Sequence, residues 1–135
     1  MHKEVLRKVR AVTGLMDNTH GELRLFGQAH SQGTETAHNL SPHLKKMMEI
    51  NAFAPARILH KGDFADAKNH INRFDIVPYC DPVGIIKGLA AKNIRYHPTC
   101  GGVLADHAYN SPNFKNTRAL IGRARMIRST MRGIK

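Results

Sequence analysis

Apolar residues recur every three or four positions in both terminal segments of the chain, which is the spacing of an amphipathic helix. This spacing predicts one basic helix over residues 3–16 and another over about 115–131. In the second helix, the apolar stripe that we expect to face the domain or a partner protein is Leu120, Ala124, Ile127 and Met131. The opposite face carries Arg118, Arg125, Arg128 and Arg132.

Between these ends, short helical and strand patterns alternate. Short apolar runs predict strands over residues 22–26, 57–60, 75–80 and 94–96. Helices are predicted over 42–52 after Ser41, over 63–74 with Asp63 as cap, and over 83–93 after Asp81-Pro82. Residues 27–39 and 97–113 are rich in turn formers and are predicted to be irregular. The alternation predicts an α/β or α+β layered domain of short strands and helices, spanning residues 1–135 with a basic helix at each end.

Composition narrows the class of protein. The chain has 135 residues, of which 41% are hydrophobic, and contains only two cysteines. No apolar run is long enough for a membrane span, and the first residues lack the apolar core of a secretory signal. These features predict a compact intracellular domain, located in the cytoplasm or within a viral particle.

The positive charge is large and unevenly distributed. Lysine and arginine number 21 against 10 acidic residues, for a formal net charge of +11. Residues 115–135 contain no acid at all. Such a segment favours contact with the phosphate backbone of nucleic acid, through Arg118, Arg123, Arg125, Arg128 and Arg132. The alternatives are a solvated basic surface, an anionic membrane or an acidic protein partner.

A second set of residues resembles the ligands of a structural zinc ion. The segment His97-Pro98-Thr99-Cys100 is followed by two glycines, a context typical of zinc knuckles. With one upstream thiol and one downstream imidazole, the tetrahedral set would be Cys80, His97, Cys100 and His107. Because Cys80 has no second ligand at knuckle distance, the alternative is two free thiols and two surface histidines.

Nuclease chemistry is the first catalytic hypothesis for a basic chain with nine histidines. On the predicted helix, Asp63, Asp66 and His70 would share one face, with His60 close by. That arrangement could hold a divalent cation or activate a water, although the two aspartates could equally cap the helix. We identify no Walker loop, Rossmann glycine pattern or serine-nucleophile elbow; the polar segment 27–33 could line a site but matches no motif.

The function that these observations favour is a non-catalytic nucleic-acid-binding protein that uses its arginine-rich C-terminal helix. Two alternatives stay open: a small histidine- or metal-dependent nuclease, and a structural subunit of a ribonucleoprotein or virion, bound to other protein subunits. The only cofactor that the sequence suggests is zinc.

Overall fold

The computed structural model describes residue 3 and residues 24–132, with side-chain surroundings through residue 124. The predicted helix over residues 3–16 therefore lies outside the described residues. So do the side chains of Ile127 and Met131 and those of Arg125, Arg128 and Arg132.

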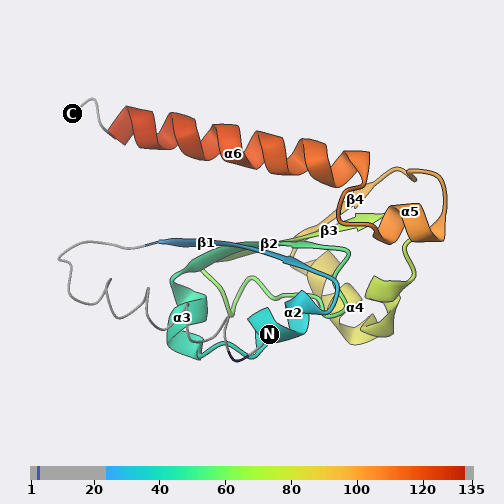
Figure 1. Ribbon diagram of the computed structural model, residues 1–135. Coiled ribbons are helices and arrows are strands. Elements are labelled where there is room, and N and C mark those ends of the chain that lie inside the picture. Colours follow the sequence, from blue (N-terminus) through green and yellow to red (C-terminus); the bar gives the residue numbers. More distant parts are fainter. Residues whose placement is uncertain (1–2, 4–23, 133–135) are drawn as a thin grey trace.

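A parallel sheet of four strands forms the centre of the fold (Figure 1). The strands stand side by side in the order in which they occur in the chain: β1 (Leu25–His30), β2 (Met48–Phe53), β3 (Asp66–Asn72) and β4 (Ile94–His97). The α/β class predicted from the alternating pattern is thereby confirmed. Because all four strands are parallel, their carboxyl ends lie at one edge of the sheet, where loops can bring distant residues together.

Helices lie on both faces of this sheet (Figure 1). One face is covered by α2 (Gly33–His38), α3 (Pro42–Lys46) and α4 (Pro82–Ala90), and the long helix α6 (Pro112–Arg132) lies along the other. A 3-10 turn, η1 (Val77–Cys80), and a short helix, α5 (Val103–His107), follow β3 and β4. No helix of the described residues is both long and apolar enough to cross a membrane.

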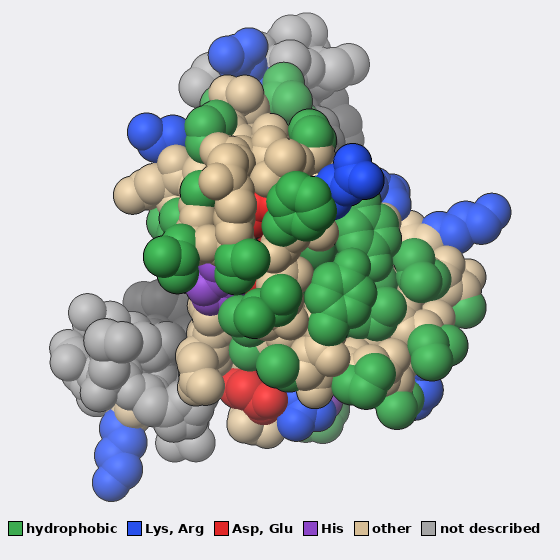
Figure 2. Space-filling model, turned by 90° about the vertical axis from the view of Figure 1, so that its right-hand side faces the viewer, with side chains coloured by type: hydrophobic (Ala, Val, Ile, Leu, Met, Phe, Trp, Pro, Cys, Tyr) green, Lys and Arg blue, Asp and Glu red, His purple; other side chains and the backbone are tan. Residues whose placement is uncertain are grey.

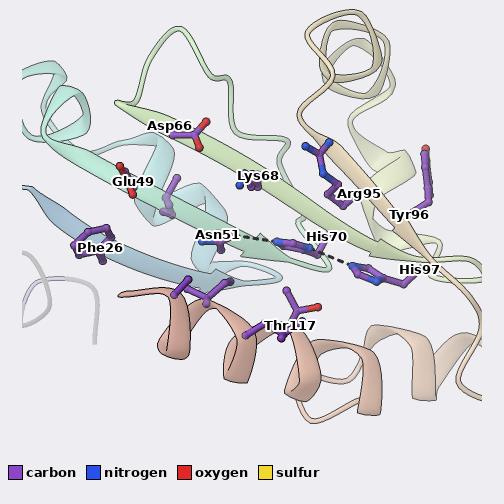
Figure 3. Close-up of a pocket in the computed structure, with 14 residues that line it drawn as sticks. Phe26, Glu49, Asn51, Asp66, Lys68, His70, Arg95, Tyr96, His97 and Thr117 are labelled. Carbon is purple, nitrogen blue, oxygen red and sulfur yellow. Dashed lines mark hydrogen bonds between the residues drawn. The ribbon is translucent and has the colours of Figure 1, made fainter. Parts of the chain in front are cut away.

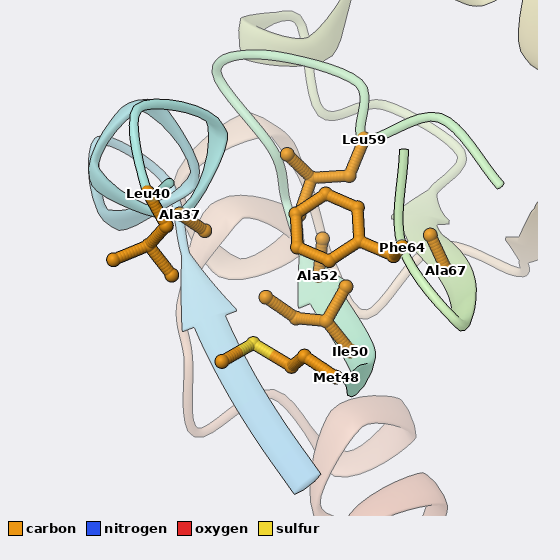
Figure 4. Close-up of a cluster of buried hydrophobic side chains, with 8 residues drawn as sticks. All are labelled: Ala37, Leu40, Met48, Ile50, Ala52, Leu59, Phe64 and Ala67. Carbon is orange, nitrogen blue, oxygen red and sulfur yellow. The ribbon is translucent and has the colours of Figure 1, made fainter. Parts of the chain in front are cut away.

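The main core fills the space between the sheet and α2 (Figure 4). Its members are Ala37, Leu40, Met48, Ile50, Ala52, Leu59, Phe64 and Ala67. A smaller cluster beneath α4 consists of Ile58, Ile71, Ile85 and Ile94. On the other face, Phe53 and Phe114 are both fully buried, with ring centroids 5.2 Å apart, and this contact packs α6 against the sheet.

Of the two middle segments predicted as helices, 42–52 is helix only in its first half, and 63–74 is a strand for most of its length. Ser41 does cap a helix, since its Oγ accepts a hydrogen bond from the Leu44 N–H, but α3 ends at Lys46 and β2 follows. Met48, Ile50 and Ala52 are buried on alternate positions, which is a strand period. In the segment predicted as a helix over 63–74, burial alternates only in the first half of β3, and residues 69–72 are all buried, three of them polar, so the strand period is concealed.

Three other element predictions are also wrong, while two are confirmed. The segments 57–60 and 75–80 contain no strand, and β1 and α2 occupy most of the predicted loop over 27–39. The helix after Asp81-Pro82 is confirmed as α4, and the strand at 94–96 as β4. Asp81 caps α4 by accepting a hydrogen bond from the Gly84 N–H.

Helix α6 is present over Pro112–Arg132, and the described members of its predicted apolar stripe, Leu120 and Ala124, line the cavity between the sheet and α6. Leu120 is 62% exposed, whereas Phe114 is fully buried. Phe114, Thr117, Arg118 and Ile121 also lie on the side of α6 that faces the sheet, as their helical spacing allows. The prediction omitted Phe114, the largest apolar residue on this side of α6, because it began the helix at residue 115.

Candidate active site

The chain makes a sharp strand-to-helix turn at Ser31. Strand β1 ends at His30, α2 begins at Gly33, and Ser31 between them has a left-handed backbone, with φ +52°. Residues other than glycine rarely adopt this conformation, which costs about 1–2 kcal/mol. A strained residue of this kind persists only where its surroundings hold it in place.

Backbone hydrogen bonds hold the Ser31 turn from both sides. The Ser31 N–H donates to the Phe53 carbonyl at 3.1 Å, at the carboxyl end of β2. The Ser31 carbonyl accepts hydrogen bonds from the Thr34 N–H at 3.1 Å, the Thr34 hydroxyl at 2.7 Å and the Ala56 N–H at 3.2 Å. The backbone is therefore fixed, and the Ser31 hydroxyl is left to interact beyond the edge of the sheet.

The imidazole of His107 bridges this hydroxyl and a buried carboxylate. Its Nε2 lies 2.9 Å from Ser31 Oγ, and its Nδ1 lies 3.0 Å from each carboxylate oxygen of Asp75. Because a carboxylate only accepts hydrogen bonds, Nδ1 carries the proton. Nε2 is then free to accept the proton of the Ser31 hydroxyl. Ser31, His107 and Asp75 thus form a hydrogen-bonded Ser-His-Asp triad.

The three residues meet because each follows a parallel strand. Ser31 follows β1, Asp75 lies in the turn after β3, and His107 ends α5, which follows β4. The Asp75 side chain is fully buried and also accepts a hydrogen bond from the Val77 N–H at 3.0 Å. The His107 side chain is 26% exposed, so part of its ring is accessible to solvent.

Asp106 connects the turn that carries Asp75 to the helix that carries His107. This fully buried carboxylate accepts hydrogen bonds from the Phe74 N–H, at 2.8 Å, and from the Thr99 hydroxyl, at 3.1 Å. Its backbone carbonyl accepts a hydrogen bond from the Asn72 side chain at 2.9 Å. Phe74 and Asp106, which adjoin Asp75 and His107 in the sequence, are thus hydrogen-bonded to each other.

His30, the last residue of β1, contacts His107 through both its side-chain nitrogen and its ring. His30 Nε2 donates a hydrogen bond to the His107 carbonyl at 2.7 Å, and the two ring centroids are 5.2 Å apart. The Tyr109 ring lies 5.4 Å from the His30 ring, and the Arg118 guanidinium stacks on Tyr109 at 3.9 Å. Helix α6 is therefore connected to the triad through a row of ring contacts.

None of the three triad residues was assigned a catalytic role from the sequence. The segment Ala29-His30-Ser31-Gln32-Gly33 differs from the nucleophile-elbow pattern G-x-S-x-G only in having Ala29 in place of the first glycine. The turn accommodates this change, because a Cβ added to Gly33 would lie 3.9 Å from the Ala29 Cβ, an ordinary contact. Residues 29–33 thus form a strained strand-to-helix turn like that of a nucleophile elbow, although the first glycine of the sequence motif is absent.

The four predicted zinc ligands lie in different surroundings. His107 belongs to the triad, and His97 Nε2 lies 3.1 Å from His70 Nδ1. Cys80 is exposed, and Cys100 Sγ accepts a hydrogen bond from Asn113 Nδ2 at 3.2 Å. Within the described part of the chain, no three histidine, cysteine or acidic side chains gather so as to hold a metal ion.

The predicted nuclease residues separate into two groups. Because residues 66–72 form a strand and not a helix, Asp66 and His70 point to the same face, while His60 and Asp63 lie in the preceding turn. Asp66 and His70 line a cavity of about 530 Å³ between the sheet and α6, together with Lys68 (Figure 3).

The histidine pair in this cavity is held in its neutral form. His70 Nε2 donates to Asn51 Oδ1 at 2.9 Å, which leaves His70 Nδ1 to accept a hydrogen bond from His97 (Figure 3). Burial, reinforced by the proximity of His97, lowers the pKa of His70 to about 3. Burial also lowers the pKa of His97. His70 Nδ1 and His97 Nε2 are hydrogen-bonded to each other, and His70 Nε2 is hydrogen-bonded to Asn51. Neither ring therefore bridges a hydroxyl and a carboxylate as His107 does.

The predicted phosphate-binding arginines are described in part. Arg118 is half-buried and donates a hydrogen bond to the Tyr109 carbonyl at 2.7 Å, so it contributes to the packing of α6. Arg123 is exposed on the same helix.

No protein-family model, curated protein or solved structure is a significant match to the chain. Its function must therefore be inferred from the geometry of the site.

Proposed function

We propose that the protein is a serine hydrolase that cleaves carboxylic esters, with Ser31 as the nucleophile. The observation that carries this proposal is the position of the His107 imidazole, 2.9 Å from Ser31 Oγ and 3.0 Å from the buried Asp75 carboxylate. Two hydrogen bonds of this kind on one ring orient a general base toward a hydroxyl.

The chemistry follows from these contacts. Ser31 Oγ attacks the carbonyl carbon of the ester, and its proton passes to His107 Nε2. The bond between the carbonyl carbon and the alkoxy oxygen then breaks, and His107 gives its proton to the departing alcohol. Water attacks the resulting acyl-serine with His107 again as base, which releases the carboxylic acid and restores Ser31. Asp75 stays ionised and stabilises the imidazolium that forms in each half of the reaction.

The turn also offers a group that can stabilise the negative oxygen of the tetrahedral intermediate. The residue after the nucleophile is Gln32, whose N–H has no acceptor among the described residues. A backbone N–H in this position contributes to the oxyanion hole of enzymes with a nucleophile elbow. We assign the same role to the Gln32 N–H.

Fold-level analogy points in the same direction. In α/β-hydrolases the serine lies on a strained strand-to-helix turn, and the partners follow in the order serine, acid, histidine. Here the order is Ser31, Asp75 and His107, in segments that follow the carboxyl ends of parallel strands. Since a fold hosts many activities, this analogy supports the proposal less than the triad itself does.

The test is hydrolysis of p-nitrophenyl acetate by the full chain and by two alanine variants. Ser31→Ala should lower kcat by about 10⁶-fold, because the nucleophile is lost. Ser41→Ala is the matched control: Ser41 is an exposed helix cap away from the triad, and its loss should cost about 1 kcal/mol of stability and no activity. Equal activity of Ser31→Ala and the unmodified chain would refute the proposal.

Nucleic-acid binding through α6 stays a prediction from the sequence. It is compatible with a hydrolase site, because the exposed Arg123 lies on α6 and the triad lies at the edge of the sheet.

A further inference from the structure

The described surface has one region in which exposed apolar side chains concentrate. Of twelve large apolar side chains that are exposed, only Phe26 and Leu120 lie elsewhere, and the other ten fall within residues 74–109. We use the name apolar face for six of these ten side chains: Phe74, Ile76, Val83, Ile86, Leu89 and Leu104. Figure 2 shows hydrophobic side chains gathered over the side of the molecule where the strands end.

Helix α4 is apolar on its outer side as well as its inner side. Ile85 packs in the core cluster beneath the sheet, whereas its neighbour Ile86 is 68% exposed. Val83 and Leu89 lie three residues to either side of Ile86 and are also exposed. A helix that is apolar around most of its circumference is typical of one covered on both sides. Extended exposed apolar patches mark interaction sites.

The exposed charged residues of the segment that forms the apolar face, residues 73–109, are of one sign. Arg73, Lys87, Lys92 and Arg95 are all exposed. Among the acidic residues of the same segment, Asp75 and Asp106 are buried. The third, Asp81, is half-buried and accepts hydrogen bonds from the N–H groups of Ile58 and Gly84. An apolar surface with exposed cations and no fully exposed carboxylate matches the interface of an anionic lipid bilayer.

This surface is continuous with the candidate active site. Phe74 and Ile76 flank Asp75 in sequence, and Leu104 lies on α5, the helix that ends with His107. The backbone of Phe74 is joined to α5 through its hydrogen bond to Asp106. A surface that docked these residues would therefore contact the same segments that position the triad.

We propose that the apolar face docks on an anionic phospholipid surface and presents the Ser31 triad to ester lipids held there. The choice of substrate rests on the proposed hydrolase function, whereas the docking does not. A lipid surface is favoured over a second copy of this chain, because two copies that each carry a net charge of +11 repel each other. The same charge attracts an anionic bilayer.

The docking test uses the full chain with Ser31→Ala, so that lipid is not consumed. Cosedimentation is measured with vesicles of pure phosphatidylcholine and with vesicles that contain about 30% phosphatidylserine. We expect at least about 10-fold tighter binding to the anionic vesicles, weakening as salt rises. Adding Ile86→Asp and Leu104→Asp should reduce binding to anionic vesicles by at least about 10-fold, since both place a carboxylate in the apolar face.

The matched control adds Leu120→Asp, one change of the same kind at an exposed leucine on α6, and should bind as Ser31→Ala does; it is compared with Ile86→Asp alone, which adds the same charge. Circular dichroism verifies that each variant is folded. Unchanged binding by the Ile86 and Leu104 double variant would overturn the proposal. So would a dimer in sedimentation velocity that this double variant dissociates, because a second copy would then cover the face.

Catalysis is assayed separately in chains that keep Ser31. The Ile86 and Leu104 double variant should retain hydrolysis of p-nitrophenyl acetate and lose at least about 10-fold in hydrolysis of diacylglycerol in anionic vesicles. Equal hydrolysis of the vesicle substrate with and without these changes would overturn the choice of substrate. Vesicle binding that depends on the apolar face, in a chain with no esterase activity, would refute the proposed hydrolase function and support the docking surface.

Discussion

The left-handed backbone of Ser31 makes a prediction that needs no substrate: Ser31→Gly should be more stable than Ser31→Ala. Both variants lose the contact between Ser31 Oγ and His107 Nε2, so their difference reports the backbone alone. At φ +52°, alanine keeps a strain of about 1–2 kcal/mol that glycine does not have. Glycine loses about 0.5–1 kcal/mol through its larger freedom in the unfolded chain. The balance favours glycine by roughly 0.5–1 kcal/mol.

The assay is urea unfolding of both variants, in which this difference should move the midpoint by about 0.3–0.5 M. Lys92, which also has a positive φ of 57°, is a control in which glycine should again exceed alanine. Lys87, exposed within α4, is the opposite control, because glycine in an ordinary helix should be about 1 kcal/mol less stable than alanine. If Ser31 behaves like Lys87, then the turn is not strained and the reasoning is refuted.

Four further outcomes are expected. Asp75→Asn should lower kcat for ester hydrolysis by about 10⁴-fold with little change in KM, because the amide no longer holds the His107 ring in the correct tautomer; steady-state kinetics measure it. Because burial lowers the pKa of His70 to about 3, the unfolded chain binds one more proton there between pH 6.5 and about 3. The free energy of unfolding should therefore fall as pH drops through that range, and His70→Asn should remove up to about 1.4 kcal/mol per pH unit of this slope in urea titrations. Phe114→Ala should cost about 3–5 kcal/mol of stability in urea unfolding, since this fully buried ring packs α6 against the sheet. Arg123→Glu should weaken nucleic-acid binding and reduce its salt dependence, as measured by fluorescence anisotropy; an unchanged salt slope would argue against phosphate contact by this helix.

Local signals in the sequence correctly predicted the existence of helices that have a clear start signal or a long amphipathic pattern. Asp81-Pro82 correctly located the start of α4, and the long basic helix was recognised as α6. The strand β3 was mistaken for a helix because Asn69, whose side chain bonds both backbone groups of Leu59, occupies a buried position where the alternation needs an apolar residue. A polar residue that satisfies its hydrogen bonds in the core conceals the strand period.

The site was missed for a related reason. Ser31, Asp75 and His107 are separated by more than thirty residues at each step, so their meeting depends on the parallel order of β1, β3 and β4. The local signal was Ser31 followed by Gly33, in a polar segment that was expected to match no motif; Ala29 stands where the motif has its first glycine. Left-handed backbone at Ser31 cannot be read from residue types alone, since serine seldom adopts it.

The measurement that tests the triad most directly is covalent labelling by an alkyl fluorophosphonate. In the reaction, Ser31 Oγ bonds to phosphorus and fluoride leaves, while the serine proton passes through His107 to solvent. Mass spectrometry of the intact chain should show one phosphonyl group per molecule, and peptide mapping should locate it on Ser31. Labelling should be absent from Ser31→Ala and slowed at least about 10³-fold in His107→Ala. An unlabelled chain, or a label on another serine that persists in Ser31→Ala, would contradict a nucleophilic Ser31.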